Sequence, residues 1–241
     1  MQRGIGIKTN MYEKIIEGIS LGDTIGGPTK MADIVTASLI SKKSIDVPDL
    51  VARYTDWTRS GAFDTGPTFA LVFSLIKQGI VPDEAPRITH EKLGGRSAGC
   101  APAQRIAPLS ACTYVPTSKL SQLARTEASI THYDPMAGNA SAIVSLICRF
   151  LLCGWSTKDI NAELNRLEPS AWLAINQASI GPGGLSNDAV RTAWFCLAKA
   201  EDPLAHATDL AGDLNYAPPI VGAFLAAQEI GRTSPGHFRT Y

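Results

Sequence analysis

The sequence has no excess of either charge, because its 241 residues contain 22 lysines and arginines and 22 aspartates and glutamates. A chain without net charge has no long-range attraction for nucleic acid or for an acidic membrane surface. Long apolar runs are also missing, since the longest, at 143–146 and 150–153, are far shorter than the roughly 20 residues that span a bilayer. Residues 1–10 lack the apolar segment of a secretory signal. We therefore expect no nucleic-acid partner, no membrane insertion and no export.

Paired cysteines are absent as well. The five cysteines are odd in number and form no C-x-x-C pair, and two of them lie in apolar helical runs. This pattern is typical of free thiols in a reducing compartment and argues against a structural zinc site. We expect a cytoplasmic protein with unpaired thiols at Cys100, Cys112, Cys148, Cys153 and Cys196.

Alternating strand patterns are scarce, whereas apolar residues at helical spacing are common. Ile143, Val144 and Ile147 belong to the most regular such pattern. Asp46 and Ser156 stand where helix caps are expected. The sequence predicts an all-α fold, a compact multi-helix domain of about ten helices that covers residues 1–241. Helices are expected over 11–21, 47–57, 68–77, 118–133, 137–153, 156–167, 188–199, 204–210 and 218–230, with an irregular tail after residue 231.

Polar or glycine-rich segments interrupt this pattern at 22–30, 54–68, 94–105, 131–135 and 211–216. The second of them contains two carboxylates, Asp56 and Asp64, and several threonines between two predicted helices. A loop held between packed helices is how a rigid scaffold presents functional groups. The same residues could equally well only cap helices.

Two further segments could contact a ligand. Residues 94–105 combine glycines with Arg96 and Arg105, and backbone N–H groups together with arginine can hold a phosphate. A surface loop with an ion-paired arginine is the commoner outcome of such a pattern. His132 ends a predicted helix beside Tyr133 and Asp134, which keeps a ligand-binding role open next to a purely structural one.

In this order on an all-α scaffold, the segments resemble the ADP-ribosylglycohydrolase family, of the dinitrogenase-reductase-activating glycohydrolase type. Residues 15–28, IIEGISLGDTIGGP, are similar to the opening helix and G-D-A-x-G-x-P turn of that family. Residues 98–109, AGCAPAQRIAPL, are similar to its loop ending in R-x-x-P-L. Residues 131–135, THYDP, resemble its T-H-x-D/H-P segment, and residues 211–216, AGDLNY, stand where it has G-G-D-x-D-T. The likeness covers nearly the whole chain.

The resemblance implies an all-α domain with two magnesium ions in an ADP-ribose cleft. The family binds these ions through a glutamate after the first turn, a T-D-D-T run and the D-x-D-T run. Most of these ligands are replaced here, and of five acidic positions only Asp213 remains. Because magnesium prefers several carboxylate oxygens, we expect a divergent member with degenerate metal-ligand motifs and no two-magnesium centre. Asp56 and Asp64 could still rebuild one weak magnesium site. The replacements are Lys30 for the glutamate, Thr65-Gly66-Pro67-Thr68 for T-D-D-T, and Asp213-Leu214-Asn215-Tyr216 for D-x-D-T.

Under the first functional hypothesis, the chain is a hydrolase that cleaves the N- or O-glycosidic bond of ADP-ribose to a protein or small acceptor. The expected catalytic residues are Lys30, as a positive charge in the vacated metal position, and Asp56, Asp64 and Asp213, which would orient water or stabilise an oxocarbenium-like ribose. Arg105 would hold the diphosphate. The expected substrate-binding residues are Thr65, Thr68, Gly99, Cys100, Ala101, Gln104, Arg105, His132, Tyr133, Asn215 and Tyr216.

Under the second hypothesis, the chain is a catalytically inactive domain that binds ADP-ribose or an ADP-ribosylated protein. The loss of four acidic ligands favours it. A more general third option is an N-glycosidase for small molecules. The direction of the Lys30 side chain distinguishes the hydrolase hypothesis from the binding-domain hypothesis. A lysine that points into the cleft against Asp64 and Asp213 favours a metal-free polar site, whereas one that points to solvent favours a cleft without chemistry.

Overall fold

Residues 3–233 are described by a computed structural model, with side chains from Met11 onward. Within this range the chain is built from helices and contains no β-strand, and its one isolated β-bridge joins Gly99 to Leu185. The predicted all-α fold is confirmed. The helices are α1 (Arg3–Gly22), α2 (Gly27–Lys42), α3 (Val47–Arg59), α4 (Gly66–Lys77), α5 (Ala85–Lys92), α6 (Ala101–Arg105), α7 (Pro108–Ala111), α8 (Thr117–Ser129), α9 (Pro135–Leu152), α10 (Thr157–Leu167), α11 (Pro169–Asn176), α12 (Ser186–Lys199), α13 (Pro203–Ala211) and α14 (Pro218–Thr233).

Every predicted helix is present, and apart from the start of α1 the ends differ from the prediction by at most four residues. The cap predictions are confirmed, because Asp46 accepts a hydrogen bond from Asp49 N at 2.9 Å and Ser156 accepts one from Asp159 N at 3.2 Å. Helix α1 begins earlier than predicted and α14 reaches Thr233. The rest of the predicted irregular tail lies outside the described residues.

Helices α2, α5, α6, α7 and α11 were not predicted, and α2 matters most for the site. The segment 22–30 was expected to be a connector. Gly26 instead adopts a left-handed backbone with φ of 103°, and Pro28 follows in the first turn of α2. Proline is tolerated there because the first N–H groups of a helix have no partner within it. The glycines and proline therefore start a helix, and only the stretch 23–26 is a turn.

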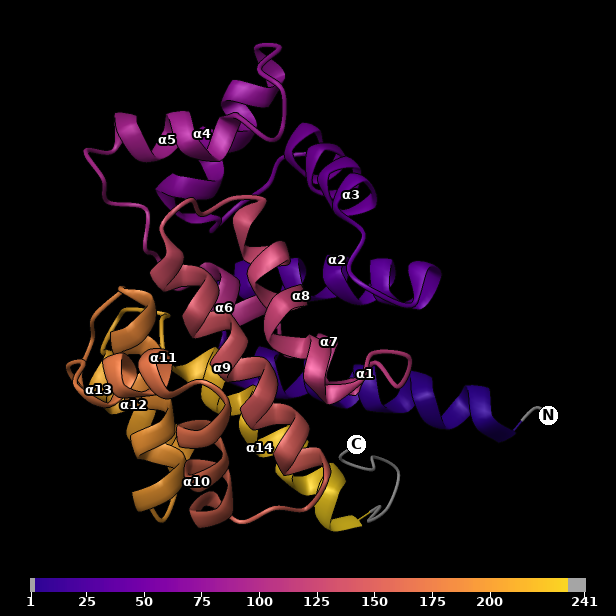
Figure 1. Cartoon of the computed structure of the whole chain (residues 1–241), viewed down its shortest axis with the longest axis vertical. Helices are drawn as coiled ribbons and strands as arrows, with labels where there is room; N and C mark the ends of the chain where they lie inside the picture. The colour runs from indigo at the N-terminus through magenta and orange to yellow at the C-terminus, as the bar shows by residue number, and fades with distance from the viewer. Residues whose placement is uncertain (1–2, 234–241) are drawn as a thin grey trace.

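Helix α9 lies at the centre of the fold, packed against α8, α14, α6 and α12 (Figure 1). It is also long and apolar enough to cross a bilayer, with a mean hydropathy of 1.4 over 18 residues, of which 83% are buried inside the fold. This corrects the expectation that no apolar segment has spanning length. Small residues such as Ala140 and Ala142 join the short apolar runs and let neighbouring helices pack closely. The burial identifies α9 as a core helix.

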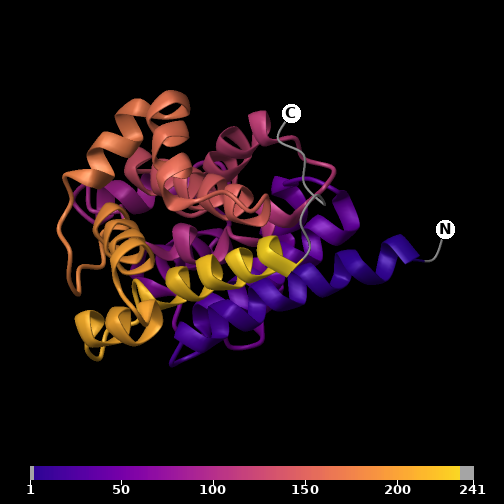
Figure 2. The same cartoon turned by 90° about the horizontal axis from the view of Figure 1, so that it is seen from below.

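The two ends of the described chain meet along α1 and α14, which run side by side in opposite directions (Figure 2). Their backbones touch at two glycines, since a Cβ added to Gly222 would lie 1.9 Å from the Gly18 carbonyl oxygen. A Cβ on Gly22 would lie 2.2 Å from the Pro218 backbone. This contact places the turn after α1 beside the loop before α14, although the two are nearly the whole chain apart in sequence.

Candidate functional site

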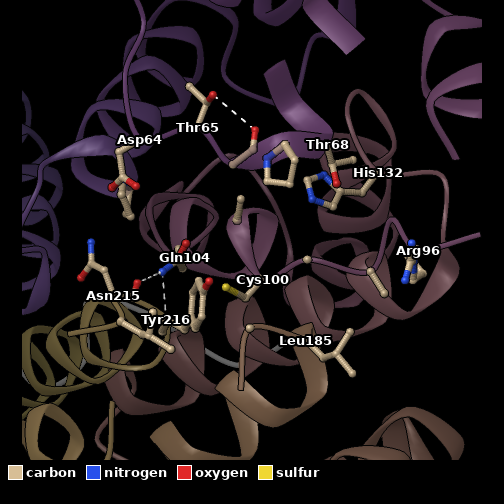
Figure 3. Close-up of a pocket in the computed structure, with 18 of the residues that line it drawn as sticks. Asp64, Thr65, Thr68, Arg96, Cys100, Gln104, His132, Leu185, Asn215 and Tyr216 are labelled. Carbon is tan, nitrogen blue, oxygen red and sulfur yellow. Dashed lines mark hydrogen bonds between the residues drawn. The ribbon is translucent and has the colours of Figure 1, made fainter. Parts of the chain in front are cut away.

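A cleft of about 640 Å³ opens where the polar segments of the chain converge (Figure 3). Its wall takes residues from all of the predicted segments, 22–30, 54–68, 94–105, 131–135 and 211–216, and from Gly184 and Leu185. The sequence analysis missed Gly184 and Leu185. The Gly-Pro-Gly-Gly run at 181–184 signals a loop, but nothing in the sequence shows that Leu185 pairs with Gly99. Most of the predicted site residues share this cleft, namely Asp64, Thr65, Thr68, Gly99, Cys100, Ala101, Gln104, His132, Asp213, Asn215 and Tyr216.

Arg105 does not line the cleft, and its predicted role on a diphosphate is wrong. Its side chain is fully buried, and its Nε donates to Glu127 Oε1 at 2.7 Å. Its Nη2 donates to Thr131 Oγ1 at 2.9 Å, and the guanidinium lies 5.3 Å from the centre of the Tyr54 ring. A guanidinium with these partners has no free face for a phosphate. Arg105 therefore stabilises the wall of the cleft from behind.

Lys30 and Asp56 also lie outside the cleft lining. Lys30 is exposed on α2, where its positive charge acts on the Asp33 carboxyl. Asp56 is exposed on α3 and pairs with Arg59 at 3.5 Å. Helix α3 extends through residue 59, so Asp56 is part of a helix surface and the predicted polar loop is shorter than expected.

Tyr133 is the remaining predicted residue outside the lining. It is 53% exposed, and its ring packs against His90 with centroids 5.4 Å apart. Arg96, which the sequence singled out beside Arg105, does line the cleft. It is exposed at the side opposite to Asp64 (Figure 3).

Asp23 organises the turn between α1 and α2. One carboxylate oxygen accepts from Thr29 N at 2.8 Å and from Thr29 Oγ1 at 2.6 Å. The other accepts from Gly26 N at 2.8 Å, Ile25 N at 3.3 Å and Asn215 Nδ2 at 2.6 Å. Burial alone would raise the pKa of Asp23, but these hydrogen bonds outweigh it and hold the pKa below its usual value. Asp23 is thus an ionised carboxylate whose lone pairs are already occupied.

Asp64, in the loop before α4, lies against Gly27 at the start of α2. It has a left-handed backbone, with φ of 48°, and a Cβ on Gly27 would lie 2.3 Å from its carbonyl oxygen. Burial and the neighbouring charge of Asp23 raise the pKa of the Asp64 carboxyl. The Gly27 N–H and the Asn215 amide offset only part of this effect. Asp64 therefore has a stronger affinity for a proton than Asp23.

Asn215 and Gln104 fix the loop before α14 against the rest of the wall. Asn215 donates to Asp23, as above, and its Oδ1 accepts from Thr24 N at 3.4 Å. Gln104 Nε2 donates to the carbonyl oxygens of Asn215 at 2.5 Å and Tyr216 at 3.0 Å. These bonds join segments that are more than a hundred residues apart. They hold the Asn215 amide toward Asp23.

His132 forms part of the buried wall. Its Nδ1 lies 2.8 Å from Thr131 Oγ1, and its Nε2 would lie 3.3 Å from a Cβ on Gly99. Burial and the positive charge of Arg105 keep the pKa of His132 well below its usual value. Cys100 is buried nearby, and burial raises the pKa of its thiol to about 12, so this sulfur is a poor nucleophile. All five cysteines are free.

The residues of the cleft do not fit the two-magnesium centre that the sequence resemblance implies. Magnesium needs several oxygen ligands in near-octahedral geometry. Asp23 has its oxygens filled by N–H and O–H donors, and Asn215 presents its amide nitrogen to that carboxylate. No group of three or more histidine, cysteine, aspartate or glutamate side chains converges in the described part of the chain.

The comparisons with known proteins agree with this architecture. The family model of ADP-ribosylglycohydrolase matches residues 10–229. A similar solved structure is described as an "ADP-ribosylglycohydrolase-related protein complex", with a TM-score of 0.70, 18% sequence identity, and coverage of 95% of this chain and 90% of that one. At this identity the likeness shows the fold alone. No curated protein matches the chain. The family match spans all the segments that build the cleft, and the chain belongs to the ADP-ribosylglycohydrolase family.

Proposed function

We propose that the cleft binds ADP-ribose and hydrolyses its glycosidic bond to a protein or small acceptor without a two-magnesium centre. The observation that carries the proposal is the convergence of the polar segments on one 640 Å³ cleft that contains a carboxylate of raised pKa, Asp64. Pockets of a few hundred cubic ångströms with a few convergent polar groups are typical of small-molecule sites. Membership of the family supports the hydrolase class.

The charges in the cleft favour one orientation of the ligand. Asp64 and Asn215 lie on one side of it and Arg96 on the other (Figure 3). A diphosphate is repelled by Asp64 and Asp23 and attracted by Arg96. We therefore orient the diphosphate toward Arg96 and the glycosidic carbon toward Asp64.

Asp64 would carry the chemistry at that carbon. As a carboxylate it accepts a proton from water while the water oxygen attacks the anomeric carbon, and the bond to the acceptor breaks with its electron pair. The leaving acceptor takes up a proton from solvent water, and Asp64 returns its own proton to solvent. The raised pKa of Asp64 makes it a better proton acceptor than an ordinary aspartate. Asp213, which also lines the cleft, would stabilise the positive charge that develops on the ribose.

The test combines binding with turnover. ADP-ribose is titrated into the full chain by calorimetry with magnesium and again with EDTA, and ADP-ribosylated acceptors are screened for release of ADP-ribose. We expect binding that survives EDTA, and turnover that Asp64→Asn abolishes while affinity is kept. Asp56→Asn is the matched control, because Asp56 is an exposed carboxylate outside the cleft. Equal turnover in wild type and Asp64→Asn would refute the assignment, and binding only with magnesium would refute the metal-free site.

The position of Lys30 favours a second candidate, a domain that binds ADP-ribose without cleaving it. Lys30 is exposed and does not line the cleft, so it does not supply the positive charge of the vacated metal position. This candidate expects ADP-ribose binding in wild type and no release from any acceptor tested. It also expects Asp64→Asn to leave affinity unchanged or to improve it, because the carboxylate repels the ligand.

A further inference from the structure

A buried hydrogen-bonded chain runs from the core of the fold to the cleft. It begins at Glu127, which accepts from Arg105 Nε at 2.7 Å and from the Tyr54 hydroxyl at 3.0 Å. Arg105 then donates to Thr131 Oγ1 at 2.9 Å, and Thr131 Oγ1 lies 2.8 Å from His132 Nδ1. Arg105, Glu127 and Thr131 are fully buried, so these bonds do not compete with water.

The direction of each bond in this chain follows from the fixed charge of arginine. A guanidinium can only donate hydrogen bonds, so Thr131 Oγ1 must accept from Arg105. The hydroxyl has a single proton left to donate, and two acceptors lie near it. The Ala128 carbonyl oxygen is 3.5 Å away, at the outer limit of a hydrogen bond, whereas His132 Nδ1 is at 2.8 Å. His132 Nδ1 is therefore the better acceptor for the one proton of the Thr131 hydroxyl.

An imidazole that accepts at Nδ1 carries its proton on Nε2 when it is neutral. The Nε2 side of His132 faces Gly99, which has no side chain to fill the space, and both residues line the cleft. A second proton on the ring would be buried beside the Arg105 charge, which is unfavourable. We propose that Arg105 and Thr131 are positioning residues that hold His132 as a neutral imidazole, so that its Nε2–H is donated into the cleft to an acceptor oxygen or ring nitrogen of the ligand.

This assignment gives His132 a defined role in recognition. It selects a ligand group that accepts a hydrogen bond, such as a carbonyl, a ring oxygen or a phosphate oxygen, over one that can only donate. It also means that His132 does not act as a base at Nε2, because that nitrogen already carries the proton. The choice of ADP-ribose as the probe ligand rests on the proposed function, whereas the tautomer does not.

The tautomer is tested in the ligand-free full chain by two-bond proton–nitrogen NMR of the histidine rings at pH 7. The chain has four histidines, and His132→Gln identifies the signal of His132. We expect the Nε2-protonated neutral form in wild type. Thr131→Val keeps the shape of the side chain and removes the donor, so the signal should move toward the Nδ1-protonated form, and Thr131→Ser should restore it. Far-UV circular dichroism and the His90 signal show that each variant is folded.

Two NMR outcomes would overturn the proposal. One is an Nδ1-protonated or doubly protonated His132 in wild type at pH 7. The other is an unchanged tautomer in folded Thr131→Val. A titration with ADP-ribose then tests the contact itself, and we expect a three- to tenfold loss of affinity in Thr131→Val, the range for one neutral hydrogen bond, with recovery in Thr131→Ser. Equal affinity in all three would overturn the contact. Absence of ADP-ribose binding in wild type would refute the proposed function and leave the tautomer standing on the NMR result.

Discussion

Breaking the buried pair between Arg105 and Glu127 should cost far more stability than breaking an exposed pair of the same length. Both side chains are 0% exposed and their atoms are 2.7 Å apart. Glu127→Gln keeps the volume and removes the charge, so Arg105 becomes a buried cation without a counter-charge. Removal of one partner from a buried ion pair costs about 3–5 kcal/mol. Since folded domains are stable by only about 5–15 kcal/mol, a large part of the total stability should be lost.

The matched control is Glu163→Gln. Glu163 pairs with Arg166 at 2.6 Å, a shorter distance, but the two side chains are 23% and 67% exposed. We expect no measurable change there, because water already screens the pair. The free energy of unfolding is measured by urea titration at pH 7, and the slopes with urea are compared to confirm that each variant unfolds in one step. A loss in Glu127→Gln no larger than in Glu163→Gln would refute the reasoning.

A double variant tests whether the unpaired charge or the changed side-chain shape causes the loss of stability. Arg105→Met with Glu127→Leu removes both charges together and leaves no buried ion behind. Replacement of a buried pair by apolar residues of similar size is often neutral or stabilising. We expect this variant to recover most of the stability lost in Glu127→Gln, although the Tyr54 hydroxyl and Thr131 lose a partner. A double variant as unstable as the single one would mean that shape, and not charge, decides the effect.

Three further predictions use the same unfolding measurements. Asp64→Asn should stabilise the fold at pH 7 by less than about 1 kcal/mol, because Asp64 is largely exposed. The pKa of Asp64 is raised in the folded chain, so this gain should shrink as the pH falls toward 3.8. A gain that does not change with pH contradicts the raised pKa. The pKa of His132 is lowered in the folded chain, so the unfolded chain binds this proton first as the pH falls. The free energy of unfolding should therefore fall by about 1 kcal/mol between pH 6.5 and 5.5. His132→Gln should flatten this loss, and a variant with the pH profile of wild type contradicts the burial of His132. Gly222→Ala, with its Cβ 1.9 Å from the Gly18 carbonyl oxygen, should cost about 3 kcal/mol or more of unfolding free energy. An unfolding free energy close to that of wild type would show that α1 and α14 can separate without cost.

The sequence predicted the fold well where periodicity and caps act locally. Helix α9 and the helices capped by Asp46 and Ser156 follow from residues within one or two turns of each other. Helix α2 was missed because Gly26, Gly27 and Pro28 have two local explanations, a turn or a helix start. In the fold Gly27 lies against Asp64, and Asp23 binds Asn215, and neither contact is visible in the neighbouring sequence.

The predictions for the site were wrong for residues whose role depends on whether the side chain is buried or exposed. Arg105 lies in a glycine-rich stretch that can hold an anion, but its partner Glu127 is 22 residues away and Tyr54 is farther still. No local pattern shows that these side chains share one buried space. Lys30 aligns with a metal-ligand position, yet it lies on the exposed face of a helix that the sequence did not predict.

The same local geometry explains how two carboxylates, Asp23 and Asp64, can lie close together at the start of α2. Asp23 receives N–H and O–H donors from the start of α2 and from Asn215, and these donors compensate its charge as a cation would. Asn215 stands where the family motif has an acid, so the replacement of that acid by an amide supplies a donor in place of a metal ligand. Asp64 receives weaker support, and its pKa rises while that of Asp23 falls. Two neighbouring carboxylates with pKa values shifted in opposite directions divide their roles, because Asp23 keeps its negative charge more strongly and Asp64 accepts a proton more readily. If the cleft hydrolyses a glycosidic bond, Asp64 is therefore the better proton acceptor of these two carboxylates.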